Sequence, residues 1–274
     1  MAGTSSRTTT VDGRTIAWHH ADPPAGAPVT VYVHGVPTSG ADWLPFLERT
    51  GGIALDQPGF GGSDPLPTPT METQADAVGR FIDTVAPGPV NLVVHDWGAT
   101  GLLWAMRHPE RIARVVILNT VPLTPGYRWH PMARLWRRRG VGEAMMAVPG
   151  PATAWLARHR TVLTRDPVPT ELTAPIARGF PAKTKRTILG IYRSADPDLL
   201  ADAGRGLGAF AGRTTLVWGI EDPYIPTTFA EAMASAIGDG AGGPAPLHRI
   251  DAGHWPWVAQ PETIDVVAEA LLGD

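Results

Sequence analysis

The feature that most constrains this chain is residues 93–99, Val-Val-His-Asp-Trp-Gly-Ala, where an apolar strand pattern changes abruptly into a helical one. Residues 90–94 are predicted to form a short buried strand, and residues 99–108 a helix. So sharp a turn between a strand and a helix lifts one side chain above a sheet, in the arrangement called a nucleophile elbow. Serine usually occupies the raised position in hydrolases of this architecture, but here the residue is Asp96.

A carboxylate at this position changes the chemistry that the turn can perform. Its attack on an ester would give a reactive anhydride, whereas its attack on an sp3 carbon gives a stable alkyl ester, which a base-activated water can hydrolyse. Asp96 therefore indicates a substrate with a leaving group on carbon, such as an epoxide oxygen or a halide. The structural alternative is that Asp96 only caps the helix that follows.

The composition is that of an ordinary globular chain, with 274 residues of which 43% are hydrophobic and 18% charged. This length allows a full core, and one large domain with an insertion is the default expectation. The absence of cysteine excludes disulfides, thiolate catalysis and cysteine-bound metals. Residues 1–10 lack the apolar stretch of a secretion signal, and no apolar run approaches the roughly 18 residues of a membrane span. We therefore expect a cytoplasmic protein without a membrane partner.

Charge is distributed unevenly along the chain, whose formal net charge is −3. Residues 122–208 contain 14 of the 23 Lys and Arg residues but 6 of the 26 Asp and Glu residues, and they show no clear strand pattern. This asymmetry predicts an α/β core from residues 1–121 and 209–274, interrupted by a helical cap from residues 122–208. The basic segment lacks the interleaved aromatic residues of a nucleic-acid-binding surface, so no nucleic-acid partner is expected.

Strand and helix patterns alternate on both sides of the insertion, which predicts a mainly parallel sheet with helices on both faces. An Asp-Gly pair at residues 12–13 also predicts a hairpin near the N-terminus. The predicted strands are residues 8–11, 15–20, 29–33, 52–55, 90–94, 114–118, 214–218 and 247–250. The predicted helices are residues 71–85, 99–108, 228–237 and 264–272, with a short helix around Trp43.

A carboxylate nucleophile needs a base to activate water, and the base needs a group that orients it. In folds with such an elbow, the acid follows the nucleophile in the chain and the histidine comes last. His254 lies directly after the last predicted strand and is the candidate base. Asp222 is the candidate acid, because it follows a predicted strand and precedes Pro223, which favours an extended backbone. Glu221 is the alternative acid and is expected to be a solvated loop charge.

Developing negative charge is stabilised by N–H donors that are already in place. Trp97 offers its backbone N–H directly after the nucleophile, and we assign the second donor to the backbone N–H of Val36 in the loop at residues 34–37. His34 in this loop is expected to make structural hydrogen bonds. Five other histidines lie in contexts typical of the protein surface: His19, His20, His108, His130 and His159.

In their order and spacing, these motifs resemble the aspartate-nucleophile branch of the α/β-hydrolase family. The resemblance covers the predicted core, about two thirds of the chain, and rests on residues 34–37, 56–64, 95–98, 219–223 and 253–254. It implies the α/β-hydrolase fold and a hydrolase that acts on an sp3 carbon without a cofactor or metal. Epoxide hydrolases and haloalkane dehalogenases share these motifs, so the reaction stays open between the two.

The resemblance implies that different side chains stabilise the leaving group in the two reactions. A dehalogenase of this branch holds its halide between the Trp97 indole and either an Asn in the loop or a tryptophan of the cap. The loop position here is Val36, whose side chain cannot donate, while the cap contains Trp129, Trp136 and Trp155. An epoxide hydrolase of this branch donates a proton from cap tyrosines, one of them in a Tyr-Arg pair about 30 residues before the acid.

Tyr192 and Arg193 form such a pair, 30 residues before Asp222. A phenol suits this role because it can donate first a hydrogen bond and then a proton. The alternative is that Tyr192 only packs a helix on the core. Where relatives have a second tyrosine, this chain offers Trp136, since Tyr127 lies early in the sequence, and a second acid position of the family holds uncharged Asn119.

We therefore predict an epoxide hydrolase that acts on a small apolar organic substrate. Asp96 is the expected nucleophile, His254 the base, Asp222 the orienting acid and Tyr192 the proton donor. The alternatives are a haloalkane dehalogenase and a non-catalytic, ligand-binding relative of the same fold.

Overall fold

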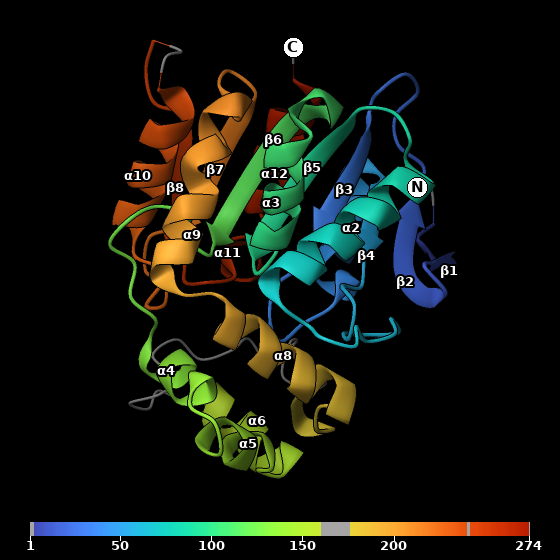
Figure 1. Cartoon of the computed structure of the whole chain (residues 1–274). Coiled ribbons are helices and arrows are strands. Elements are labelled where there is room, and N and C mark those ends of the chain that lie inside the picture. Colours follow the sequence, from blue (N-terminus) through green and yellow to red (C-terminus); the bar gives the residue numbers. More distant parts are fainter. Residues whose placement is uncertain (1–2, 160–175, 240–241, 274) are drawn as a thin grey trace.

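Eight strands form one sheet through the centre of the molecule (Figure 1). The computed structural model describes residues 3–159, 176–239 and 242–273. The strand order is β1-β2-β4-β3-β5-β6-β7-β8, in which β2 is antiparallel to β1 and β4 and the other pairings are parallel. This confirms the predicted mainly parallel sheet. The strands are β1 Ser5–Val11, β2 Arg14–Ala21, β3 Val29–Val33, β4 Gly52–Leu55, β5 Val90–Asp96, β6 Ile112–Thr120, β7 Thr214–Gly219 and β8 Leu247–Ile250.

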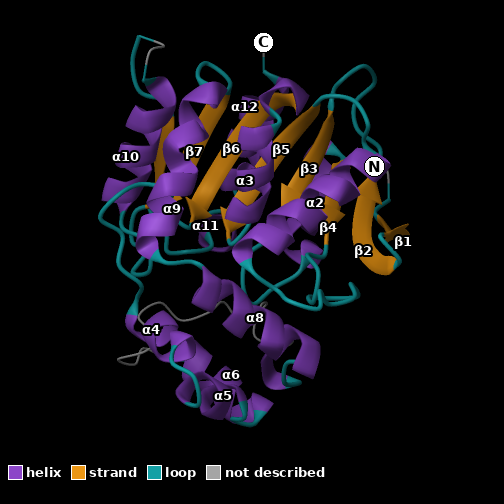
Figure 2. Cartoon of the chain, viewed as in Figure 1, coloured by secondary structure: helices purple, strands orange, loops and turns teal. Residues whose placement is uncertain are grey.

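Helices cover both faces of the sheet (Figure 2), as the alternating pattern predicts. Buried residues of α2, α3 and α10 pack on one face, and those of α1 and α12 pack on the other. The helices and 3-10 helices (η) are η1 Gly40–Trp43, α1 Leu44–Thr50, α2 Met71–Val85, α3 Ala99–Arg107, η2 Pro109–Arg111, α4 Pro131–Arg137, α5 Val141–Met146, α6 Gly150–Arg158, α8 Ala182–Ser194, α9 Pro197–Ala203, η3 Gly204–Phe210, α10 Thr227–Gly238, α11 Pro256–Ala259 and α12 Thr263–Leu272.

Local sequence signals account for several element boundaries. Asp12 and Gly13 have φ angles of 49° and 73°, the left-handed conformations that a two-residue hairpin turn requires, and they join β1 to β2 as predicted. Helix α2 has its predicted bounds, and Thr70 and Thr73 form a capping box that defines its N-terminus. Strand β5 extends two residues beyond its prediction, since its polar end is also buried and continues to pair with β6.

Four helices of the predicted insertion lie together beyond one end of the sheet (Figure 1): α4, α5, α6 and α8, here called the insertion helices. They lie at the carboxyl ends of the parallel strands, because Asp96 at the end of β5 shares a cavity with Trp136 of α4 and Tyr192 of α8. In contrast, η3 packs against α3 and α10 of the core. The division of the chain at residues 122 and 208 stays a prediction.

Several basic residues of this region are held by local partners. Arg137 donates to the Ala195 carbonyl at 2.7 Å, and Arg193 forms an ion pair of 2.7 Å with Glu143. Lys183 donates to the Ser63 carbonyl at 2.8 Å and so ties α8 to the core. Among the helices that the structure describes, none is long and apolar enough to span a membrane.

Candidate active site

Asp96 is raised at the end of β5 by a strained turn, as the elbow motif predicts. Its φ of 48° lies in the left-handed region, which is unfavourable for a residue with a side chain and is typical of functional sites. The register of β5 against β6 also shifts between His95 and Asp96. Gly98 makes the turn possible, because a Cβ there would lie 2.3 Å from the Val33 carbonyl oxygen.

The loop after β3 brings an N–H donor to this carboxylate. The Val36 N–H donates to Asp96 Oδ2 at 2.8 Å. Gly35 permits the approach, since a Cβ there would lie 2.4 Å from the Asp96 Cβ. His34 fixes the loop through the structural hydrogen bonds that the sequence predicts, because its Nε2 accepts from the Gln57 N–H at 2.9 Å and its Nδ1 lies 2.7 Å from the Gly35 carbonyl.

Burial raises the pKa of Asp96 above the ordinary value of a carboxyl group. The nearby His254 lowers the pKa, and so do hydrogen bonds from the Val36 and Trp97 N–H groups, but these contributions do not outweigh desolvation. The carboxylate is therefore less stable than an exposed one. A poorly solvated carboxylate is also a stronger nucleophile, which suits attack on carbon.

His254 and Asp222 meet beside Asp96. The His254 Nδ1–H donates to Asp222 Oδ2 at 2.7 Å, while His254 Nε2 lies 3.9 Å from Asp96 Oδ1, which is too long for a direct hydrogen bond. Asp222 is buried and Glu221 is exposed, in agreement with the choice of Asp222 over Glu221. The imidazole thus lies between two carboxylates and presents Nε2 to the one at the elbow.

Two residues to which the sequence analysis gave no catalytic role hold this pair in place. The Asn119 side-chain amide donates to Asp222 Oδ2 at 2.8 Å, so the position that lacks a charge still orients the acid. The His95 Nε2–H donates to the His254 carbonyl at 2.8 Å, and burial keeps the pKa of His95 well below its usual value. Asp222 Oδ1 also accepts from the backbone N–H groups of Tyr224 and Ile225, at 2.8 and 3.1 Å.

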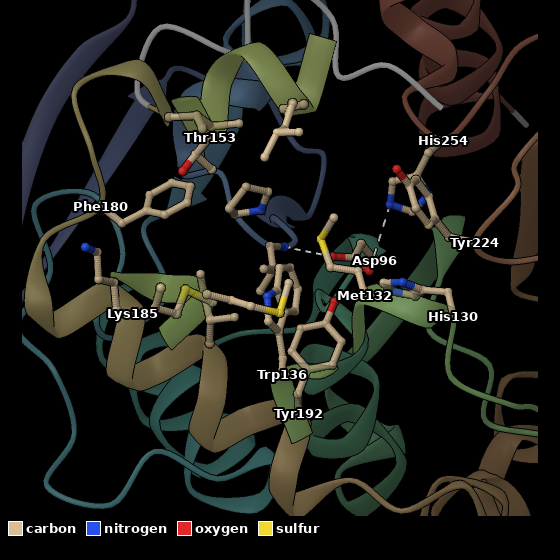
Figure 3. A pocket seen from close by; sticks show the side chains of 18 of the residues that line it. Asp96, His130, Met132, Trp136, Thr153, Phe180, Lys185, Tyr192, Tyr224 and His254 are labelled. Carbon is tan, nitrogen blue, oxygen red and sulfur yellow. Dashed lines mark hydrogen bonds and ion pairs between the residues drawn. The ribbon is translucent and has the colours of Figure 1, made fainter. Parts of the chain in front are cut away.

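A cavity of about 350 Å³ lies between the carboxyl ends of the strands and the insertion helices. Figure 3 shows Asp96 and His254 at one end of the cavity. Its wall is mainly apolar and aromatic in the part of the chain that the structure describes, including Val121, Trp129, Met132, Trp136, Ile188, Tyr192 and Trp255. Such a wall suits a small apolar molecule with its reactive carbon at Asp96.

Tyr192 and Trp136, the two predicted donors of the cap, both line this cavity. The Tyr192 ring is 5.1 Å from the Trp97 ring and 5.1 Å from the Trp136 ring, measured between centroids. Figure 3 shows the Tyr192 hydroxyl on the side of the ring that faces Asp96. Burial and the Asp96 charge raise the pKa of Tyr192 well above its usual value, which keeps the phenol protonated.

Two further aromatic residues approach the base. His130, expected at the surface, lines the cavity, because the loop before α4 folds back toward the sheet; its ring is 5.0 Å from that of Tyr224. Tyr224 lies 5.4 Å from His254, again between ring centroids. The surface prediction for His130 was therefore wrong. The only local signal at His130 is its position before Pro131, at the start of a helix. That signal does not show that the residue lines the cavity.

A buried acid follows the loop that carries Val36 in the chain. Asp42 lies in η1, where Oδ2 has no hydrogen-bond partner among the residues described, and burial raises its pKa to about 7 with a smaller contribution from Asp56. In the unfolded chain this carboxyl group ionises near 3.9. The folded state therefore binds the proton more tightly, and stability is lost as the pH rises from about 4 to about 7.

We expect Asp42→Asn to remove this pH dependence, because the amide cannot ionise. The free energy of unfolding of the variant, relative to wild type, should rise by about 4 kcal/mol between pH 4 and pH 8. Urea denaturation across this range measures it, with exposed Glu48→Gln on α1 as the control. Parallel profiles for Asp42→Asn and wild type would contradict the prediction.

Comparison with known proteins agrees with this geometry. Residues 28–258 match the family model described as the alpha/beta hydrolase fold. The chain belongs to the α/β-hydrolase family. Among curated relatives, this α/β hydrolase is 28% identical to epoxide hydrolase 2 of Siraitia grosvenorii over 84% of the chain and 80% of that protein. It is 36% identical to a haloalkane dehalogenase of Agrobacterium fabrum over 38% of the chain and 36% of that protein.

A solved structure shows the same fold over nearly the whole α/β hydrolase. The haloalkane dehalogenase DbeA of Bradyrhizobium elkani superposes with a TM-score of 0.79 at 22% identity, covering 99% of this chain and 98% of that one. Several matches to curated relatives are partial, and the chain aligns with less than half of their length. Within the described residues, no group of three or more His, Cys, Asp or Glu side chains could hold a metal ion.

Proposed function

We propose that this α/β hydrolase opens epoxides to vicinal diols through an ester between a substrate carbon and Asp96. The observation that carries the proposal is the Tyr192 phenol, which lies in the same cavity as Asp96, with its hydroxyl on the side facing the carboxylate (Figure 3). An opening epoxide develops an alkoxide, which is a poor leaving group without a proton donor. Tyr192 provides that donor at the elbow.

In the first step, Asp96 Oδ1 attacks an epoxide carbon. Oδ2 is already held by the Val36 N–H, so Oδ1, which faces His254, is the oxygen available for attack. A bond forms between Oδ1 and carbon, the epoxide C–O bond breaks, and the Tyr192 proton passes to the departing oxygen. Ester formation removes the Asp96 charge, which is one cause of the raised pKa of Tyr192, so the phenol becomes a better acid as its proton is needed.

In the second step, His254 takes a proton from water, and the resulting hydroxide attacks the ester carbonyl carbon. The carbonyl oxygen is Oδ2, so the negative charge of the tetrahedral intermediate develops where the Val36 and Trp97 N–H groups already donate. Asp222 stabilises the imidazolium that forms. As the intermediate collapses, its C–O bond to the substrate breaks, and the proton of the hydroxyl group added from water passes to the departing oxygen. This releases the diol and regenerates the Asp96 carboxylate. The proton held by the His254 imidazolium returns to the Tyr192 phenolate.

Trp136 is the proposed second donor to the epoxide oxygen. Its ring lies 5.1 Å from the Tyr192 ring and lines the same cavity. An indole N–H donates a hydrogen bond but does not transfer a proton, so Trp136 can orient the oxygen while Tyr192 protonates it. The similarity to epoxide hydrolase 2 over most of the chain supports epoxide opening as the reaction.

Haloalkane dehalogenation is the second candidate, and one observation favours it. The Trp97 indole Nε1 is buried beside the nucleophile, where its N–H acts on the Tyr192 phenol and lowers the pKa of that group. An indole N–H beside the nucleophile could stabilise a departing halide. The Val36 side chain cannot supply a second donor. A mixed panel of epoxides and bromoalkanes, with diol and bromide measured separately, distinguishes the two reactions, and neither product would be formed by a protein that only binds ligands.

Tyr192→Phe removes the hydroxyl group and almost nothing else, so folding should be unchanged. We expect the rate of ester formation from an epoxide to fall about 10²-fold, the usual cost of losing a positioned acid. Single-turnover measurements determine this rate. Tyr127→Phe is the matched control, because it removes another buried hydroxyl from the same cavity.

Full epoxide activity in Tyr192→Phe would contradict the assigned role of the phenol. Bromide release by wild type, without a diol from any epoxide, would identify the protein as a dehalogenase instead.

A further inference from the structure

The cavity holds a positive charge at the end opposite Asp96. Lys185 lines the cavity from α8, and Figure 3 shows it beside Phe180, away from Asp96 and His254. Apart from the histidines, Lys185 and Asp96 are the only charged side chains among the described residues that line the cavity. An otherwise apolar cavity therefore has a negative charge at its reactive end and a positive charge at the other.

The Lys185 ammonium differs from neighbouring cations, which form hydrogen bonds or ion pairs within the fold. Lys183 donates to the Gly61 and Ser63 carbonyls, and Arg193 pairs with Glu143. Within the described parts of the chain, no hydrogen bond or ion pair reaches the Lys185 ammonium, although the residue is only partly exposed. A cation that has no partner in the fold can pair with an anion that enters the cavity.

The start of α8 strengthens this positive field. The first turn contains no acidic residue, while Lys183, Lys185 and Arg186 all lie within the first two turns. Cations at a helix N-terminus oppose the helix dipole, so this placement is unfavourable for the helix alone. An anion bound there would be attracted by both the dipole and the ammonium.

The position of Lys185 on α8 sets the separation of the two groups. Lys185, Ile188 and Tyr192 follow helical spacing, and all three line the cavity, so they share one face of α8. The seven steps from Lys185 to Tyr192 span about 10 Å along the helix axis. A molecule that contacts both ends must therefore carry its anion a medium-length apolar chain away from the epoxide.

We propose that the substrate is an aliphatic epoxide with a carboxylate at its far end, which binds Lys185 while the epoxide lies between Asp96 and Tyr192. This inference rests on the epoxide hydrolysis proposed above and adds its substrate class. Attraction at Lys185 and repulsion from Asp96 both orient the molecule in the same direction, since they keep the carboxylate away from the nucleophile. Lys185 thus determines specificity and takes no part in the chemical steps.

The test compares the terminal epoxide of undecenoic acid with that of its methyl ester. In wild type, kcat/KM should be about tenfold higher for the acid, mostly through KM, as expected for one charge-assisted hydrogen bond. Lys185→Met should remove this preference by weakening only the acid, and Lys185→Arg should retain it. Arg186→Met is the matched control, because Arg186 is an exposed cation on the same helix that does not line the cavity. Equal values for the acid and the ester in wild type would overturn the inference and leave epoxide hydrolysis intact.

A second measurement does not depend on hydrolysis. Undecanoate has no epoxide, and its binding can be followed by calorimetry, with undecanol as the neutral probe. Lys185→Met should weaken undecanoate binding about tenfold and leave undecanol binding unchanged. This result in a protein that hydrolyses no epoxide would support the anion site while refuting the proposed reaction. Binding of undecanoate that is equal in wild type and Lys185→Met would refute the anion site.

Discussion

His254→Gln is expected to leave Asp96 covalently modified after a single reaction with an epoxide. Attack by Asp96 needs no general base, because a carboxylate is itself the nucleophile, whereas hydrolysis of the ester needs the proton acceptor that His254 provides. Steady-state turnover should therefore fall by about 10⁴-fold, the upper end of the range for general-base catalysis. Intact-protein mass spectrometry should show one adduct per chain, and peptide mapping should place it on Asp96.

The control for this variant is His248→Gln, which makes the same substitution at an exposed residue of β8, the strand before the His254 loop. It should turn over normally and accumulate no adduct. An adduct on any residue other than Asp96 would exclude the proposed nucleophile. If His254→Gln formed no adduct with an epoxide that wild type hydrolyses, the covalent mechanism itself would be wrong.

Asp222→Asn should produce the second large loss. Asp222 holds the proton on His254 Nδ1 through the 2.7 Å hydrogen bond, and this leaves Nε2 free to accept a proton from water. An asparagine can turn its N–H₂ toward Nδ1, which would place the imidazole proton on Nε2 and block that role. The rate of ester hydrolysis should fall by about 10⁴-fold, as for the equivalent change in serine protease triads.

Glu221→Gln provides the matched control, since Glu221 is the neighbouring acid and lies exposed. Its turnover should stay within about twofold of wild type, because surface charges contribute little at such a site. Similar losses in both variants, or a larger loss in Glu221→Gln, would reassign the orienting acid. Single-turnover kinetics should also show that Asp222→Asn slows ester hydrolysis more than ester formation.

Several parts of this site were predictable because their signals are local. The elbow around Asp96 is defined by a strand pattern that meets a helix pattern, and the left-handed φ of 48° follows from that junction. Asp222 and His254 were identified by their positions directly after predicted strands. The carboxyl ends of parallel strands meet at one edge of a sheet, so residues far apart in sequence are brought together there.

Other residues gave no such signal. Asn119 was noted only for lacking a charge, and its bond to Asp222 depends on the pairing of β6 with β7. His130 follows Trp129 in an irregular segment, and its local sequence is typical of an exposed loop. Its place in the cavity depends on how the loop before α4 packs over the sheet.

Short-range signals in the sequence were enough to predict the α/β architecture, the approximate bounds of the core strands and of four core helices, and the places of Asp96, Asp222 and His254 at strand ends. These follow from short-range periodicity, turn chemistry and chain order, which neighbouring residues encode directly. The packing of distant segments sets how the insertion helices cover the cavity, which oxygen of Asp96 the Val36 N–H holds, and that Lys185 lines the far end of the cavity. Those features depend on the packing of segments distant in sequence, where burial and partner groups, rather than residue type, set the properties of each side chain.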